Sequence, residues 1–259
     1  MRIPIYQIDA FTGRLFAGNP AAVCPLEDWL EDNVMQAIAA ENNLSETAFF
    51  VRRGDRYHLR WFTPTVEVDL CGHATLASAY VILNYLGEAS DAVVFDTRSG
   101  ELIVRRNGDL LSMDFPARPP VECPAPAKLE GALGRRPVAT LMSRDLMAVF
   151  ESEAEVRALR PDMNQLAQLE AFAVIVTAPG EESDFVSRFF APRGGVPEDP
   201  VTGSAHCTLV PYWSKRLGKT SLYARQVSPR GGELWCLDRG DRVVIQGRAV
   251  RFMQGEIVI

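Results

Sequence analysis

This sequence has few of the residues that bind metals or form disulfide frameworks. It holds only three scattered histidines and an odd number of cysteines, five, with no C-x-x-C pair. We therefore expect no metal site, and we expect the cysteines to be reduced thiols. The sequence also lacks the G-x-G-x-x-G and G-x-x-x-x-G-K-[ST] motifs. Neither a nicotinamide nor a nucleotide is implied, and we expect no cofactor.

Clusters of basic residues and long apolar runs are absent as well. No Lys/Arg run exceeds a pair and the formal net charge is −6, which argues against nucleic-acid binding. The longest apolar run, ATLASAYVIL at 74–83, is about half of a membrane span, so no membrane crossing is expected. The first residues are typical of a strand and lack the apolar core of a signal peptide, which predicts a cytoplasmic protein.

A duplicated block is the main feature that the sequence does contain. RWFTP at 60–64 reappears as RFFAP at 188–192. In the first copy a glutamate, Glu67, lies five residues before Gly72. In the second copy Glu198 stands in the same relation to a later glycine, Gly203. Two copies of one unit are the simplest explanation.

Each block leads into a stretch with the pattern of a helix, 72–87 and 203–218, closed by a glycine. Pro211 predicts a kink or a late start in the second of these helices. A third helix is expected over 30–43, and most of the remaining chain is typical of short strands. An apolar helix surrounded by strands favours an α+β fold with two pseudo-symmetric domains, each a barrel-like curled sheet around a central helix.

The proline-rich segment 117–128 marks the break between the two halves. We place the domains at 1–118 and 119–259, and the last strand, Glu256 to Ile259, is free to return to the first domain.

The two repeated helices begin with Gly72 and Gly203, which leave backbone N–H groups uncovered at the positive end of the helix dipole. Such an end suits a carboxylate. If the copies pack about a pseudo-twofold axis, both helix starts meet in a cleft that binds a small carboxylated molecule. The alternative is that these glycines only permit close packing against a strand.

Four segments carry a resemblance to a known family: GNPAAVC, SETAFF, CGHATLASA and EDPVTGSAH, in this order. They resemble the PhzF family of phenazine-biosynthesis-type isomerases, over nearly the whole chain except about 120–180. The resemblance implies a fold similar to that of diaminopimelate epimerase and proline racemase, a site between two like domains, and a homodimer. The founding members of the family isomerise a dihydro-hydroxyanthranilate.

The two positions before the helix-start glycines differ in whether they can move a proton. In the racemase relatives a cysteine precedes each helix-start glycine, whereas here Cys71 stands at the first position and Thr202 at the second. A hydroxyl holds its proton far more tightly than a thiol, which disfavours a two-thiol mechanism. Glu46 begins an otherwise apolar strand, and its counterpart in a loose alignment of the halves is Ala171. The resemblance implies that Glu46 is the catalytic acid/base; alone, it would be interpreted as a solvated strand-end residue.

Other site residues follow from the resemblance, which implies substrate contact by His73. It also makes Asp199 a ligand that accepts from a substrate amino group, and Ser204 a ligand that donates to a carboxylate. By itself Asp199 would be interpreted as a turn residue. A hydrolase triad of Ser204, His206 and Asp199 is disfavoured, because no G-x-S-x-G elbow occurs.

Three functional hypotheses remain open. The first is a cofactor-independent isomerase that shifts a proton on a small carboxylated substrate through Glu46. The second is an amino-acid or hydroxy-acid epimerase or racemase that depends on Cys71. The third is a non-catalytic protein that binds a carboxylated metabolite.

Overall fold

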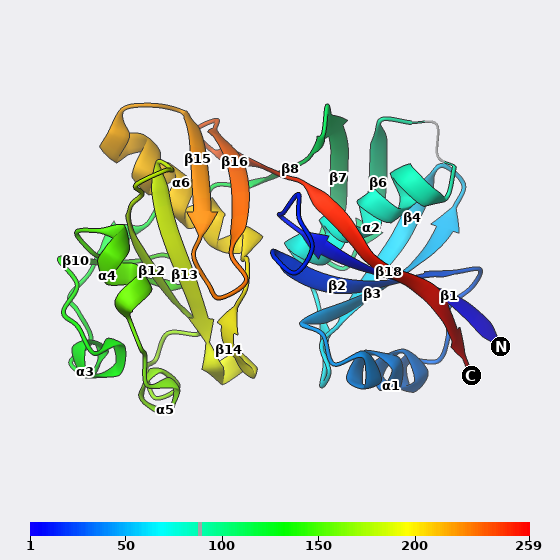
Figure 1. The fold of residues 1–259 in the computed structure, drawn as a ribbon, viewed down its shortest axis with the longest axis horizontal. Helices are drawn as coiled ribbons and strands as arrows, with labels where there is room; N and C mark the ends of the chain where they lie inside the picture. The colour runs from blue at the N-terminus through cyan, green and yellow to red at the C-terminus, as the bar shows by residue number, and fades with distance from the viewer. Residues whose placement is uncertain (88–89) are drawn as a thin grey trace. The chain divides into compact units, whose positions relative to one another are not determined.

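The computed structural model describes residues 1–87 and 90–259, which form two compact units (Figure 1). The first unit comprises Met1–Asp114 with Gln246–Ile259, and the second comprises Phe115–Ile245. The division falls before the boundary that the sequence suggested at 118. The reason is that the amides of Ala117 and Arg118 already donate to carbonyls of the second unit, those of Asp241 and Cys207.

The sheet of the first unit follows the order β18–β1–β2–β3–β4–β6–β7–β8, with β5 paired to β4. The pairs β2–β3 and β4–β6 are parallel and the others are antiparallel. The strands are β1 (Arg2–Ala10), β2 (Asn19–Leu26), β3 (Glu46–Arg53), β4 (Arg56–Phe62), β5 (Glu67–Val68), β6 (Ala92–Thr97), β7 (Gly100–Asn107), β8 (Leu110–Pro116) and β18 (Ala249–Val258).

Helix α2 (Gly72–Tyr85) lies among these strands and contacts β1, β2, β3, β6, β7 and β18 (Figure 1). Its first three turns are almost wholly buried, which agrees with an apolar helix enclosed by a curled sheet. Helix α1 (Asp32–Asn42) buries Met35 and Ile38 in a separate apolar cluster with Phe49 and Phe62. The helices expected at 72–87 and 30–43 are thus confirmed, each with slightly shorter bounds.

The second unit repeats this strand order as β9–β10–β11–β12–β13–β15–β16, with β14 paired to β13. Here β11–β12 and β13–β15 are the parallel pairs, in the same places as in the first unit. The strands are β9 (Val121–Glu122), β10 (Ala139–Met142), β11 (Leu146–Val149), β12 (Val174–Pro179), β13 (Phe185–Ala191), β14 (Val196–Asp199), β15 (Ser221–Gln226) and β16 (Gly232–Asp238). Strand β17 (Arg242–Gly247) begins in the second unit, and its last two residues belong to the first.

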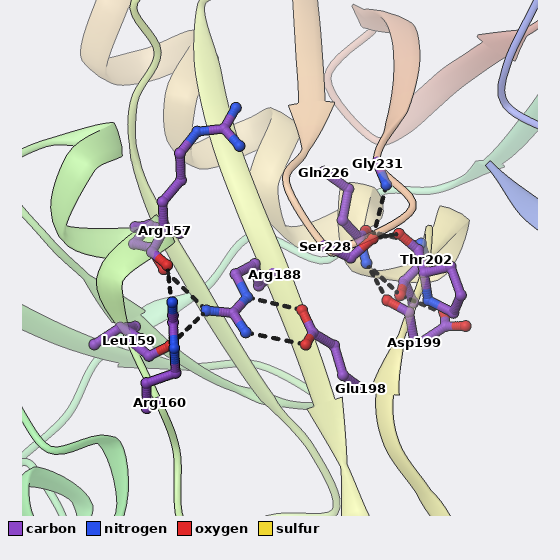
Figure 2. Close-up of polar contacts among 12 residues, drawn as sticks. Arg157, Leu159, Arg160, Arg188, Glu198, Asp199, Thr202, Gln226, Ser228 and Gly231 are labelled. Carbon is purple, nitrogen blue, oxygen red and sulfur yellow. Dashed lines mark hydrogen bonds and ion pairs between the residues drawn. The ribbon is translucent and has the colours of Figure 1, made fainter. Parts of the chain in front are cut away.

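An ion pair is duplicated along with the strands. In the first unit Arg60 donates from Nε and Nη2 to both carboxylate oxygens of Glu67, at 2.7 and 2.8 Å. In the second unit Arg188 donates in the same way to both carboxylate oxygens of Glu198, at 2.7 and 3.0 Å (Figure 2). This two-pronged geometry is among the stronger side-chain pairings. The internal repeat is therefore a structural one, and its sequence blocks mark equivalent positions.

Helix α6 (Gly203–Leu217) is the counterpart of α2 and runs through Pro211. The prediction of a late start was wrong, because the helix begins at Gly203. Pro211 has no N–H to donate to the Cys207 carbonyl one turn earlier. That carbonyl instead accepts from the Arg118 amide at 2.8 Å. The segment that follows β8 thus supplies the hydrogen bond that the helix lacks.

The segment from 120 to 180 contains short helices that the sequence pattern did not predict. Their apolar residues pack in one cluster with β11 and β12, including Leu133, Val156 and Leu166. The elements are α3 (Leu129–Leu133), α4 (Glu153–Ala158) and α5 (Met163–Leu166). A 3-10 turn, η1 (Pro192–Gly194), lies beyond this segment, after β13. Within the described part of the chain, no helix combines the length and apolar character that crossing a bilayer requires.

Candidate active site

Glu46 is the first residue of β3, at the point where the strand enters the core. The five residues that follow it are buried, whereas the Glu46 side chain is 17% exposed. A carboxylate in this position is costly unless a partner compensates its lost hydration. The strand thus carries an acid to the edge of the apolar interior.

The partner is His73, the second residue of α2, which is buried. Its Nε2 lies 3.1 Å from Glu46 Oε2 as an ion pair, although the geometry is not that of an aligned hydrogen bond. Among the described residues, neither atom has a hydrogen-bond partner. A buried polar atom without a partner calls for an explanation, and an ordered water or a bound ligand is one. The pair therefore offers one acceptor and one ring nitrogen to a third group.

Two further residues contact the other ring nitrogen of His73. Asn19, at the start of β2, places Nδ2 at 3.2 Å from Nδ1, and Cys71 places Sγ at 3.4 Å. A side-chain amide nitrogen can only donate, so this contact suits a ring whose proton is on Nε2. Burial lowers the pKa of His73, but its interactions with Cys71 and Glu46 outweigh burial and hold that pKa well above its usual range. In either charge state the Nε2 proton faces Glu46.

Cys71 precedes α2 as its N-cap residue, the first of the two positions that the sequence comparison of the halves singled out. Burial, helped by the nearby Glu46 charge, raises the pKa of Cys71 to about 11. The side chain is therefore a protonated thiol at neutral pH, and only a thiolate acts as a base or a nucleophile. Glu46, whose Oε2 lies 3.1 Å from His73 Nε2, is then the candidate base of this cluster.

Glu46, Cys71 and His73 also bring one oxygen, one sulfur and one nitrogen ligand atom within 4.8 Å of one another. Such a set could in principle hold a transition metal. However, His73 turns Nδ1 toward Cys71 and Nε2 toward Glu46, and these opposite nitrogens cannot bind the same ion. The thiol would also have to lose its proton. The residues do not fit a metal centre, and the expectation of a metal-free site stays a prediction.

The corresponding region of the second unit has a different set of contacts (Figure 2). Asp199 ends β14, and Gly203 and Ser204 begin α6. Thr202, at the place of Cys71, donates its hydroxyl proton to Asp199 Oδ2 at 2.5 Å. Gln226 accepts from the Thr202 amide at 2.8 Å and donates to the Asp199 carbonyl at 2.7 Å. The hydroxyl that replaces a thiol is thus already engaged.

The strand registers place the counterpart of Glu46 at a different residue from the one the sequence suggested. Thr47 pairs with Phe62 on β4, and Val174 pairs with Phe190 on β13. Because Phe62 and Phe190 are equivalent in the repeat, the residue before Val174, Ala173, is equivalent to Glu46. The suggested counterpart, Ala171, was two positions away, but the conclusion that only one half carries an acid here is unchanged.

His206 does not form a hydrolase triad with Ser204 and Asp199. It is fully buried on α6, and its Nδ1 lies 2.9 Å from the Thr202 carbonyl. Burial lowers the pKa of His206 to about 4. A ring bonded back to its own helix is a core residue, which leaves Ser204 without this base.

The structure thus groups the predicted residues Glu46, Gly72 and His73 in the first unit. It groups Asp199, Gly203 and Ser204 around the start of α6 in the second. Sequence reasoning assigned no role to Asn19, although it lies in the family-like segment GNPAAVC. It also missed Gln226, which lies in no family-like segment and which only the contacts reveal.

Comparisons with known proteins bear on this geometry. Residues 8–255 match the family described as phenazine biosynthesis-like protein. An uncharacterized isomerase from Pseudomonas aeruginosa is 55% identical over 257 residues, which cover 99% of each chain. A crystal structure of a PhzF family phenazine biosynthesis protein from Enterococcus faecalis is 49% identical, covers 100% of both chains and has a TM-score of 0.98. A probable proline racemase from Agrobacterium radiobacter covers 99% of this chain and 93% of its own at 10% identity. Its TM-score of 0.64 shows a shared fold alone.

Proposed function

Because this chain belongs to the phenazine biosynthesis-like (PhzF) family of isomerases, we propose that it shifts a proton within a small carboxylated substrate through a single acid/base, Glu46, without a cofactor. The observation that carries the proposal is the pair of buried atoms Glu46 Oε2 and His73 Nε2, 3.1 Å apart and without hydrogen-bond partners among the described residues. They supply a base and a donor that the fold itself does not use.

The proposed reaction assigns each group one step. The Glu46 carboxylate takes a proton from one carbon of the substrate and returns it to another carbon on the same face. The Nε2–H of His73 donates to the negative charge that develops on the substrate in between. Ala173 and Thr202 stand where a second base would be needed in the second unit. The absence of a base at these two positions favours one proton carrier over a two-base epimerisation.

Substrate recognition in this proposal uses the helix starts. The free N–H groups at Gly72 bind a substrate carboxylate, because neither a side-chain cap nor an acidic residue occupies the first turn of α2. Asp199 accepts from an amino group, Ser204 donates to a carboxylate, and Gly203 offers its N–H groups in the same way. We predict that the residues at the starts of α2 and α6 bind the same substrate. The test is to measure the affinity of one ligand for the Asp199→Asn and Glu46→Gln variants: both should change it.

We further infer a homodimer that works in the cytoplasm. The homodimer follows from the family resemblance. The five free cysteines, four of them buried, support a reducing compartment.

The test follows rearrangement and deuterium uptake when small amino- and hydroxy-carboxylates are incubated with the protein in heavy water. Glu46→Gln is expected to lower turnover by about 10² to 10⁴, the usual contribution of a general acid/base. Glu41→Gln, an exposed acid on α1, is the matched control and should leave turnover unchanged.

The alternatives predict other outcomes in the same assay. Loss of exchange with Cys71→Ser but not with Glu46→Gln would replace the proposal with a thiol-dependent epimerase. A compound that binds the unmodified protein but never exchanges or rearranges would leave a carboxylate-binding protein.

A further inference from the structure

The loop between β14 and α6 is held by a buried amide from a neighbouring strand (Figure 2). Gln226 is the last residue of β15 and is 1% exposed. Its Oε1 accepts from the Thr202 amide at 2.8 Å. Its Nε2 donates to the Asp199 carbonyl at 2.7 Å and to Thr202 Oγ1 at 3.2 Å. One side chain therefore ties together the backbone and the side chains of this loop.

These contacts set the direction of the hydrogen bonds. The amide nitrogen of Gln226 can only donate, so Thr202 Oγ1 accepts at that contact. The single hydroxyl proton of Thr202 is then directed to Asp199 Oδ2, 2.5 Å away. A carboxyl oxygen that accepts this proton is favoured in its ionised form. The side chain of Gln226 therefore donates to that of Thr202, which in turn donates to the carboxylate of Asp199.

The usual role of a threonine before a helix does not explain this arrangement. Thr202 is the N-cap of α6, where a hydroxyl commonly accepts from an amide of the first turn. Here it makes no such bond. Ser228 binds the same loop, because its Oγ donates to the Pro200 carbonyl at 2.7 Å and accepts from the Gly231 amide at 3.1 Å.

Among the described residues of the first unit, the equivalent positions form no such network. Val68 pairs with Trp61 just as Asp199 pairs with Phe189, so a valine stands in the place of the acid. The position equivalent to Gln226 is Thr97, whose hydroxyl donates to the Gly100 carbonyl in its own hairpin. The network is thus a feature of the second unit and not a requirement of the repeated fold.

We propose that Gln226 and Thr202 are positioning residues that hold Asp199 as an oriented hydrogen-bond acceptor for an N–H or O–H donor of the substrate. This inference deepens the proposed function and depends on it for the identity of the ligand. It assigns the second unit the recognition of a donor group on the substrate, and it leaves the proton transfer to Glu46.

The test compares two probes, 2-aminobenzoate and benzoate, which differ only by an amino donor beside the carboxylate. The unmodified protein is expected to prefer 2-aminobenzoate in calorimetric titrations. Thr202→Val should reduce this preference by about tenfold, the value of roughly one hydrogen bond to a charged group, with little change for benzoate. Thr202→Ser, which keeps the hydroxyl, should keep the preference for 2-aminobenzoate. Gln226→Leu should behave like Thr202→Val, with circular dichroism to verify folding.

A second measurement does not need a ligand. Carbon-13 NMR of the Asp199 carboxyl should show that Thr202→Val raises the pH of protonation by about 1, and that Thr202→Ser does not. If the probes fail to bind and the titration still moves, the proposed substrate class is wrong but the positioning role stands. An unchanged probe preference, or an unchanged titration, in Thr202→Val would overturn the inference.

Discussion

In the first unit a thiol, Cys71, precedes the central helix and contacts a histidine, whereas in the second a hydroxyl, Thr202, precedes it and contacts an aspartate. The strand order, the parallel pairs and the arginine–glutamate pair are the same in both units. Duplication therefore preserved the framework while the residues at the helix starts diverged. The two units thus share a framework but present different groups at their helix starts.

Two buried histidines show the same divergence. Burial lowers the pKa of both His73 and His206. At His73 the interactions with Cys71 and Glu46 reverse that effect, whereas His206 faces a backbone carbonyl and its pKa stays low. The comparison shows that burial alone does not decide the charge of a histidine; the neighbouring acid does.

The largest effect is expected when the shared ion pair is removed from each unit in turn. Arg188→Met should cost about 3–5 kcal/mol, since it leaves Glu198 unpaired and removes donors from the Val156 and Leu159 carbonyls. Arg60→Met should cost less, about 1–2 kcal/mol, because Glu67 keeps Arg98 at 2.8 Å. Urea denaturation measures both.

Each unit carries its own buried tryptophan, Trp61 or Trp213, whose fluorescence reports the transition. The double variant Arg60→Met/Arg98→Met is the control and should approach the cost of Arg188→Met. Equal costs for the two single variants would contradict the role given to Arg98.

A smaller effect is expected from pH through His206. In the unfolded chain this histidine binds a proton below about pH 6.5, whereas burial in the folded unit lowers its pKa to about 4. Between these values the unfolded state binds more protons, so the free energy of unfolding rises with pH. The total across the window is on the order of 3 kcal/mol. His206→Leu should flatten this slope between pH 4 and 6.5.

His58→Leu is the matched control, because that side chain is 47% exposed. Its slope should match that of the unmodified protein. If His206→Leu keeps the full slope, the acid sensitivity resides in other groups, and the contrast between the two histidines is smaller than the structure indicates.

The smallest effect is expected at Cys71. Burial raises the pKa of this thiol to about 11, so its thiolate fraction at pH 8 is on the order of 10⁻³. Iodoacetamide should label Cys71 slowly at neutral pH, and the rate should rise with pH while the fold persists. Mass spectrometry of a Cys123→Ser background, which removes the half-buried thiol, measures the rate. Rapid labelling at pH 7 would favour the thiol-dependent epimerase.

Some of the fold could be predicted because the duplication is visible in the sequence. RWFTP and RFFAP, with the glutamate five residues before each helix-start glycine, identified equivalent strands and helices. The secondary structure of the region from 129 to 166 was harder to predict from the sequence. Its helices are four to six residues long, too short to show a helical period, and they form because they pack in a shared cluster.

The candidate site was predictable in part. Glu46 was recognisable as an acid at the head of an apolar strand, and Cys71 and Thr202 as unlike residues at like positions. Asn19 and Gln226 could not be assigned, because a hydrogen bond across 54 or 24 residues leaves no local pattern.

The sequence by itself determined the repeat, the enclosed helices, the family and the acid at position 46, since these depend on residue identity and local spacing. The tertiary structure decided which atoms meet. Strand register brings Glu46 to His73 in the first unit, and Gln226 to Thr202 and Asp199 in the second. Charge and hydrogen-bond direction follow from those contacts, because burial acts on every enclosed group while only specific neighbours decide which one keeps its proton.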